Sequence, residues 1–244
     1  MIEIILDLKN GEKKRLPENT FVVAVDDTGH EEFKDPNYQV FGIGGCAFLV
    51  RDYQRLIERP WNYMCQHFFP DIGRPIHATD LRNLSSTQHG AFKHFFEKFE
   101  FFRIAVTASV KSEKEVEANF IEIAGASLLQ RICEIGEWAE FDRLFILFEE
   151  SERIEMKVLQ SLSGKKIKQN SKEIKIELGL IPKSASIPAM EVADIIIHTA
   201  GAQTKSRISG KKEVRKDFEI IFRNVDNRLV SFAEITRIEK TKSL

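Results

Sequence analysis

Continuous apolar runs and helix-spaced apolar positions alternate along this chain. Residues 21–25 (FVVAV) and 144–148 (LFILF) have the length and the side-chain types of buried strands. Because strand and helix patterns alternate, we predict one mixed β-sheet flanked by α-helices, an α/β protein. Further strands are predicted at 3–8, 38–50, 102–110, 173–178 and 230–238, and helices at 52–69, 85–99, 112–140, 152–162 and 188–202.

Local signals predict where several elements begin and end. The apolar run at 21–25 is expected to end at 26–29 (DDTG), followed by a polar loop to residue 37. Glycines interrupt the strand at 38–50, which predicts a bend or a bulge. Helix caps are expected at Ser85 or Ser86 and at Ser112, the latter with Glu115 at capping-box spacing.

The composition fits one globular domain. Apolar residues make up 43% of the chain and charged residues 30%, and no linker or repeat is visible. We therefore treat 1–244 as a single domain with an N-terminal strand extension (1–20) and a basic C-terminal region (203–244). The 19 phenylalanines, against 2 tryptophans and 3 tyrosines, predict a Phe-rich core, since Phe needs no hydrogen-bond partner when buried.

The sequence favours a cytoplasmic protein without a membrane segment. No apolar run approaches the roughly 18 residues that a membrane span needs. The N-terminal stretch carries its charges after the apolar residues, unlike a signal peptide. Cys46, Cys65 and Cys133 are widely spaced and form no metal-type pair, as expected of reduced thiols.

Charge is unevenly distributed along the chain. Residues 1–162 hold 19 basic and 27 acidic side chains, whereas residues 163–244 hold 17 basic and 10 acidic ones. Such asymmetry can mark a surface that binds nucleic acid. It is equally compatible with two solvated surfaces of opposite sign.

Acidic residues follow two of the apolar strand patterns. Asp26 and Asp27 come directly after 21–25, and Glu149 and Glu150 come directly after 144–148. In open α/β sheets, ligands bind beyond the carboxyl ends of the strands. Taken alone, each acidic pair could instead form a turn or cap a helix.

Asp194 is a third acid in an unusual setting. It lies in the apolar helix pattern AMEVADIIIHTAG, with Glu191 and His198 on the same helix face. A lone carboxylate is costly to bury there unless it meets a metal ion or a cation, or has a raised pKa. One alternative is a salt bridge to a buried Arg or Lys.

Together these acids predict a metal site. Asp26, Glu149 and Asp194 come from separate elements and could hold two divalent cations at roughly 4 Å from each other. Oxygen ligands of this kind suit Mg²⁺ or Mn²⁺. Such a site could activate a water molecule against a phosphodiester.

Two histidines and one further acid are candidate accessory groups. His77 and Asp80 lie three residues apart at a predicted loop-to-helix junction, where one could bind a ligand or transfer a proton. The alternative is that Asp80 caps the helix and His77 packs over the loop. His30 follows the first acidic pair and could also reach the site.

The order of these motifs resembles the domain-of-unknown-function 3800 family of the ribonuclease-H-like superfamily. That family opens with a strand and Asp-Glu-Ser-Gly, which is similar to DDTG at 26–29. A Gly-rich strand follows, as at 40–45 (VFGIGG), and then a His-Ala-x-Asp-Leu-like segment, as at 77–81 (HATDL). A later strand of the family usually ends in Asp, where this chain has Glu149, and an Ala-Asp-hydrophobic helix follows, as at 192–196.

The resemblance spans roughly residues 21–201 and implies a ribonuclease-H-like fold. It also implies that Asp26, Glu149 and Asp194 match a metal-binding acidic set. Because the family's activity is largely unassigned, a nuclease function rests on analogy with the superfamily.

Three functions are compatible with these patterns. We expect foremost a Mg²⁺- or Mn²⁺-dependent nuclease with Asp26, Glu149 and Asp194 on the metal, and His77, Asp80, Asp27 or Glu150 assisting. A non-catalytic module of the same fold, binding nucleic acid or protein, is the alternative. An aspartyl-nucleophile phosphatase fits poorly, since Thr28 replaces the second Asp that such enzymes carry. Phosphate contacts are expected from Lys205, Arg207, Lys211, Lys212, Arg215 and Lys216, and further ones from Lys165, Lys166 and Lys168.

Overall fold

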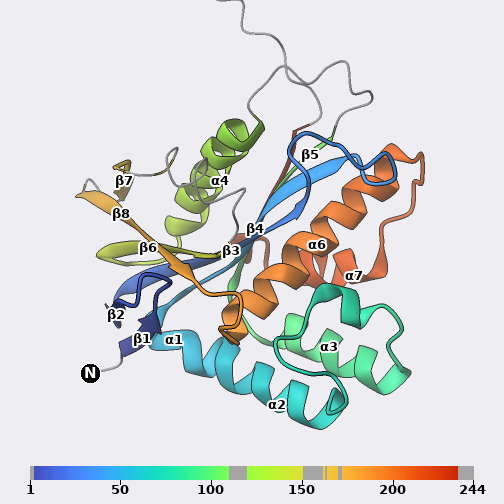
Figure 1. Cartoon of the computed structure of the whole chain (residues 1–244), viewed down its shortest axis with the longest axis horizontal. Helices are drawn as coiled ribbons and strands as arrows, with labels where there is room; N and C mark the ends of the chain where they lie inside the picture. Colours follow the sequence, from blue (N-terminus) through green and yellow to red (C-terminus); the bar gives the residue numbers. More distant parts are fainter. Residues whose placement is uncertain (1–2, 110–119, 151–161, 163, 170–171, 236–244) are drawn as a thin grey trace, which may run out of the picture.

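A seven-stranded mixed sheet forms the centre of the molecule (Figure 1). The computed structural model describes residues 3–109, 120–150, 162, 164–169 and 172–235. Within these residues the strand order is β7-β8-β6-β3-β4-β5-β9. The predicted α/β class is confirmed. The strands are β3 (Thr20–Gly29), β4 (Val40–Leu49), β5 (Phe102–Ser109), β6 (Arg143–Glu149), β7 (Lys166–Gln169), β8 (Lys172–Ile181) and β9 (Val230–Ile235).

Strand directions place β3 at the centre of the sheet. On one side β4 pairs antiparallel with β3, and β5 pairs antiparallel with β4. On the other side β6 is parallel to β3, and β8 is parallel to β6. The carboxyl ends of β3, β6 and β8 therefore lie at one edge of the sheet.

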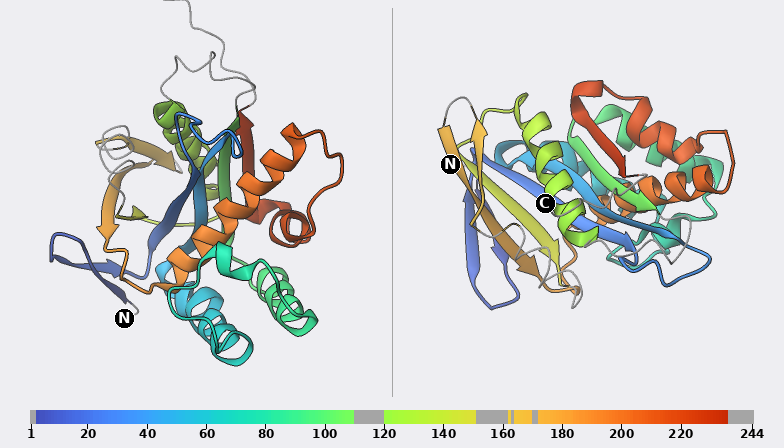
Figure 2. Two further views of the ribbon diagram at one scale, coloured as in Figure 1. Left: turned by 45° about the vertical axis from the view of Figure 1, so that its right-hand side comes forward. Right: turned by 90° about the horizontal axis from the view of Figure 1, so that it is seen from above.

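Helices cover both faces of the sheet. The long helix α6 crosses one face, and α4 lies on the other (Figure 2). Near α6, the segment after β4 folds back as helical turns that lead into α3. The helices are α1 (Val50–Tyr53), a π-helical turn (Gln54–Glu58), α2 (Arg59–Phe68), a 3-10 turn (Ala78–Leu81), α3 (Ser86–Lys98), α4 (Phe120–Gly136), α6 (Pro188–Ile208), α7 (Lys216–Phe218), a second π-helical turn (Glu219–Arg223) and a second 3-10 turn (Asn227–Leu229).

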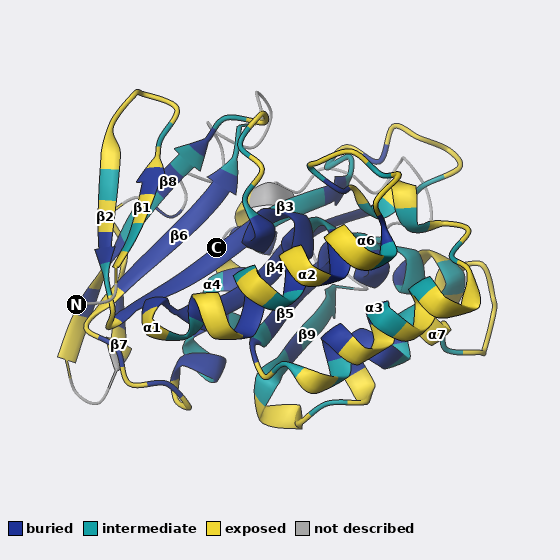
Figure 3. Ribbon diagram, turned by 90° about the horizontal axis from the view of Figure 1, so that it is seen from below, coloured by how far each residue is buried: buried dark blue, intermediate teal, exposed yellow. Residues whose placement is uncertain are grey.

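A separate hairpin precedes the sheet. Its strands β1 (Glu3–Asp7) and β2 (Lys13–Pro17) pair antiparallel with each other, and their turn is exposed (Figure 3). The Lys9 N–H donates to the carbonyl of Leu180 at 2.8 Å, which connects the hairpin to β8. The sequence predicted β1 but missed β2, because KKRLP is too polar to show a strand pattern.

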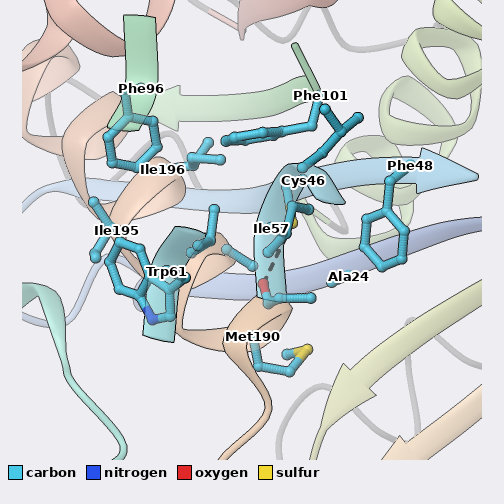
Figure 4. Close-up of a cluster of buried hydrophobic side chains, with 14 of the residues drawn as sticks. Ala24, Cys46, Phe48, Ile57, Trp61, Phe96, Phe101, Met190, Ile195 and Ile196 are labelled. Atoms are coloured by element: carbon cyan, nitrogen blue, oxygen red, sulfur yellow. Dashed lines mark hydrogen bonds between the residues drawn. The ribbon is translucent and has the colours of Figure 1, made fainter. Parts of the chain in front are cut away.

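Alternation along β3 divides the core into two layers. Val22 and Ala24 belong to the cluster beneath α6, whereas Phe21, Val23 and Val25 belong to the cluster beneath α4. Aromatic and aliphatic side chains from helices and strands interlock under α6 (Figure 4). The expected Phe-rich core is confirmed on both faces.

One prediction about the central strands is wrong, and of the bend or bulge predicted for β4 the bulge is excluded. Strand β3 does not end at Asp26 but continues to Gly29, because β4 pairs with it through Gly29 opposite Phe41. Strand β4 has no bulge, since its register with both neighbours is continuous. Its glycines make room for α6 instead: a Cβ on Gly45 would lie 2.6 Å from the Cβ of Ala193.

The remaining element predictions agree with the structure where it describes them. Ser85 caps α3 and shares a capping box with Gln88, as the sequence indicated. Helix α6 extends six residues past its predicted end at 202. The predicted cap at Ser112 and almost all of the predicted helix at 152–162 lie outside the described residues.

The cysteines form no disulfide in the described part of the chain. Cys46, Cys65 and Cys133 are all free thiols, and the first two are buried. Of the helices in the described part of the chain, none combines the length and the apolarity that crossing a membrane requires.

A buried arginine joins α3 to the sheet. Arg103 in β5 is fully buried, and its guanidinium donates to the carbonyls of Phe96, Phe99 and Phe101. The first two carbonyls belong to the C-terminal end of α3, where a positive charge is favourable. Burial lowers the pKa of Arg103 to about 9, so it stays protonated at neutral pH.

We expect Arg103→Leu to lower the free energy of unfolding by about 3 kcal/mol, because three buried carbonyls lose charged donors. Arg103→Lys should lower it less, since an ammonium keeps the charge but lacks the planar fork. Urea unfolding measures both. Equal stability of Arg103→Leu and the native chain would contradict this assignment.

Candidate active site

Asp26 faces α6 because of the alternation of β3. Val22 and Ala24 pack beneath α6, and Asp26 is the next residue with the same orientation. Asp27 faces the opposite side of the sheet, although its N–H donates to Asp26 Oδ1 at 2.8 Å. The apolar strand thus delivers a single carboxylate to the α6 side of the sheet edge.

Glu149 reaches the same place by the same rule. Phe145 and Leu147 of β6 also pack beneath α6, so Glu149 follows them on that face. Because Val25 is paired with Phe148 in the parallel ladder, Asp26 and Glu149 are the next neighbours across the two strands. The two acids therefore lie side by side at the carboxyl edge.

Asp194 completes the set from above the sheet. It is next to Ala193, whose close approach to Gly45 brings α6 onto the central strands. Its Oδ2 accepts a 2.8 Å hydrogen bond from the Ala78 N–H, and its side chain is 15% exposed. Among the described residues its partners are the Ala78 N–H and His77, and it forms no salt bridge with a buried Arg or Lys.

The three acids line one small cavity. Its volume is about 20 Å³, enough for one water-sized particle. Glu191 also contributes to the wall, so four carboxylates from three elements surround this space. The other lining residues are Pro75, Ile76, His77, Ala185 and Met190.

The electrostatics of the cavity disfavour negative charge. Burial raises the pKa of Asp26 well above its usual value, and the nearby carboxylates of Asp194, Asp27 and Glu149 raise it further. Burial also raises the pKa of Glu149, which Lys183 and His77 partly offset. A cation in the cavity would relieve this repulsion and would favour ionised Asp26.

The side chains are not arranged as a finished metal site. Within the described ranges, no group of three or more His, Cys, Asp or Glu residues is placed so that it could hold a metal ion. Acidic oxygen donors of the right chemistry nevertheless line one cavity. The donor set therefore fits Mg²⁺ or Mn²⁺ in kind, and binding would require the side chains to draw together.

His77 and Asp80 separate into two different roles. The His77 side chain is 57% exposed, and its Nδ1 lies 3.6 Å from Asp194 Oδ2, at the wall of the cavity. Asp80 lies outside the cavity and accepts the His77 N–H at 2.9 Å as part of a capping box. The capping alternative is thus confirmed for Asp80, whereas His77 remains a candidate for proton transfer.

Other proposed accessory groups lie away from the cavity. Glu150 forms a 2.8 Å ion pair with Lys9 of the hairpin. His30 Nδ1 accepts the N–H of Glu32, and its ring does not line the cavity. Of the two consecutive glutamates, Glu149 is therefore the one that faces the site.

The sequence did not predict the contacts of Glu191, which hold the loop carrying His77 over the site. Glu191 is buried, and its carboxylate accepts hydrogen bonds from Trp61 Nε1 at 2.5 Å, Arg74 Nε at 2.6 Å and Ser186 Oγ at 3.0 Å. Arg74 precedes Pro75 and His77 in the chain, so this ion pair fixes the loop that carries His77. The spacing of Glu191 and Asp194 was visible, but a loop arginine more than a hundred residues earlier gave no signal.

The predicted basic surface lies at the other end of α6. Lys205 comes eleven residues after Asp194, about 16 Å along a helix axis. Arg207 pairs with Glu234, and Arg215 pairs with Asp217 at 2.7 Å. Lys211, Lys212 and Lys216 are exposed. None of the six basic residues predicted in 205–216 lines the acidic cavity.

No family model matches the sequence, and no curated protein shows detectable similarity to it. The resemblance to the domain-of-unknown-function 3800 family therefore stays a prediction. The geometry of the site is therefore the basis of the function proposed below.

Asp26→Asn should stabilise the cation-free protein at pH 8. The native state binds a proton at Asp26 more readily than the unfolded chain, so native stability falls as pH rises from about 4 through the raised pKa of Asp26. Removing the charge should raise the free energy of unfolding more at pH 8 than at pH 5, because only the ionised carboxylate meets the repulsion. Thermal unfolding at pH 5 and pH 8 checks this, and a gain at pH 5 as large as at pH 8 would contradict it.

Arg74→Ala should lower the free energy of unfolding by about 3 kcal/mol, because it leaves the buried Glu191 carboxylate without its cation. Adding Glu191→Gln should cost less than the sum of the single changes, since the two side chains act as a pair. A double-mutant cycle in urea unfolding measures the coupling energy between Arg74 and Glu191. Additive effects would show that the two side chains do not stabilise the fold as a pair.

Proposed function

We propose that this protein is a divalent-cation-dependent phosphodiesterase that acts on nucleic acid. The observation that carries the proposal is the convergence of Asp26, Glu149 and Asp194 on one cavity at the carboxyl edge of the sheet. Acids that converge in a partly buried site destabilise a fold that gains nothing from them. A site that receives a cation accounts for their arrangement.

The strand arrangement supports a ribonuclease-H-like fold. In the order β8-β6-β3-β4-β5, neighbouring strands among β3, β4 and β5 pair antiparallel, and β6 and β8 run parallel to β3. That is the strand arrangement expected of a ribonuclease-H-like sheet. The three acids lie on the central strand, on the adjacent parallel strand and on the helix after the last parallel strand. Fold alone does not establish activity, so the proposal rests on the acids.

Asp26, Glu149 and Asp194 would hold Mg²⁺ or Mn²⁺. The ion would supply Lewis acidity, which favours deprotonation of water and offsets charge on phosphoryl oxygens. The cavity has room for one particle, so a second ion would need a more open arrangement.

His77 and Lys183 would act at the mouth of the cavity. His77 lies beside Asp194, and both His77 and Lys183 are near enough to Glu149 to lower its pKa. An exposed imidazole can give or accept a proton near neutral pH. A lysine near the acids can stabilise the charge of a phosphate that approaches them.

The first test is a calorimetric titration of the native chain with Mn²⁺. Millimolar or tighter binding is expected, and Glu149→Gln should weaken it at least about tenfold by removing a ligand charge. Glu150→Gln is the matched control, because it removes the same charge one residue away, outside the cavity. Equal affinity for the two variants would exclude Glu149 as a ligand.

The second test measures hydrolysis of labelled single-stranded DNA and RNA with Mn²⁺ present. Asp26→Asn and Asp194→Asn should each reduce the cleavage rate at least about a hundredfold, while Glu150→Gln keeps the native rate. Absence of cleavage by the native chain under conditions where Mn²⁺ binds would refute the hydrolase.

One observation favours a non-catalytic alternative. As positioned, the acidic side chains within the described part of the chain do not form a metal-binding group. A binding module of this fold would keep its affinity for nucleic acid in the Asp26→Asn variant. It would also bind no Mn²⁺ in the cavity, so the calorimetric test separates the two functions.

A further inference from the structure

A second set of polar groups lies on β3, on α6 and on the segments that follow each of them. The hydroxyl of Tyr38 is 3.2 Å from that of Thr28 in β3, and Lys205 Nζ of α6 lies 5.3 Å from the centre of the Tyr38 ring. Arg215 is near enough to lower the pKa of Tyr38. We call Thr28, Tyr38, Lys205 and Arg215 the Tyr38 cluster. In Figure 1 the loop between β3 and β4 lies beside the C-terminal end of α6.

Gly201 lets the Tyr38 cluster form. A Cβ on this residue would lie 2.4 Å from the Tyr38 hydroxyl and 2.7 Å from Thr28 Cγ2. Any side chain there would push Tyr38 away from α6. The glycine thus fixes the phenol between β3 and the helix.

The Tyr38 cluster has a defined position relative to the acids. Thr28 follows Asp26 by two residues on the same face of β3, about 7 Å along the strand. Gly201 follows Asp194 by seven residues, two turns of α6 or about 10 Å. Both ideal rises place Tyr38 roughly 7–10 Å from the acidic cavity. Consecutive phosphates of one strand are about twice as far apart as the 3.4 Å rise between stacked bases, so this distance corresponds to one to two nucleotides.

The chemistry of the Tyr38 cluster favours an anion. Residues 205–217 contain six basic and two acidic side chains. Burial raises the pKa of Tyr38, which keeps its phenol protonated as a hydrogen-bond donor at neutral pH. Lys205 is exposed, and its interaction in the structure is with the ring rather than with an acid.

We infer that the Tyr38 cluster binds one phosphodiester of a nucleic-acid strand, one to two nucleotides from the phosphate at the carboxylates. Lys205 supplies charge, and Tyr38 donates a hydrogen bond. Arg215 contributes less, because Asp217 holds its guanidinium in a bidentate pair. This inference rests on the proposed function for the position of the reacting phosphate, but it assigns a binding site that the cleavage chemistry does not require.

The test measures binding without cleavage. Fluorescence anisotropy with labelled single-stranded DNA and RNA of about 12 nucleotides is recorded in EDTA. Lys205→Gln and Tyr38→Phe should each weaken binding about threefold to tenfold, and Lys205→Gln should reduce the salt dependence by about one phosphate contact. Lys13→Gln is the control, because it removes an equally exposed positive charge from the distant hairpin.

A single neutral methylphosphonate, moved along the strand, tests the register. With Mn²⁺ the cleavage position identifies the reacting phosphate. The substitution that weakens binding to the native chain but not to Lys205→Gln should lie one to two nucleotides from it. Lack of any such position would overturn the register.

The two proposals fail on different results. Native binding that Lys205→Gln and Tyr38→Phe weaken supports the Tyr38 cluster even if no cleavage occurs. Mn²⁺-dependent cleavage, with both variants binding as tightly as Lys13→Gln, would overturn the cluster and leave the hydrolase standing. Failure of the native chain to bind either oligonucleotide would also overturn it.

Discussion

Helix α6 can lie directly on the central strands because β4 presents glycines where it crosses. A Cβ on Gly45 would lie 2.6 Å from the Cβ of Ala193, and one on Gly42 would lie 3.1 Å from the side chain of Ile197. Larger residues at either position would lift the helix from the sheet. Asp194 would then move away from Asp26. The proposed site therefore depends on a packing contact one residue away from its own acid.

That contact brings the carboxylates of Asp26 and Asp194 close to each other, and their repulsion lowers the stability of the fold. Burial raises the pKa of Asp26, and the negative charges of the neighbouring acids raise it further. The apolar side chains of β3 and β6 and the buried Arg74–Glu191 pair hold the acids in place despite this. Functional sites often retain such local destabilisation, which the surrounding core offsets. Under the proposed function, cation binding would relieve it and would couple affinity for the cation to stability.

Helix α6 also connects the two sites that we propose. Its N-terminal half carries Asp194 beside the cavity, and its C-terminal half carries Gly201 and Lys205 beside Tyr38. Strand β3 carries Asp26 and Thr28, and helix α6 carries Asp194 and Lys205. These two elements therefore fix the distance between the acidic cavity and the Tyr38 cluster. A substrate strand lying along this line would meet acids at one end and cations at the other.

The sequence alone determined the α/β class, most of the elements and the candidate acids, because periodicity and the cost of burying a carboxylate are local properties. The same alternation that marks Val22 and Ala24 as buried also predicts which way Asp26 faces, once β3 is known to continue beyond it. Tertiary structure decided the rest. Pairing with β4 extended β3, parallel register set Glu149 rather than Glu150 beside Asp26, and the capping box removed Asp80 from the site. The Arg74–Glu191 pair and the position of Tyr38 over Gly201 join residues far apart in the chain, and no local pattern encodes such contacts.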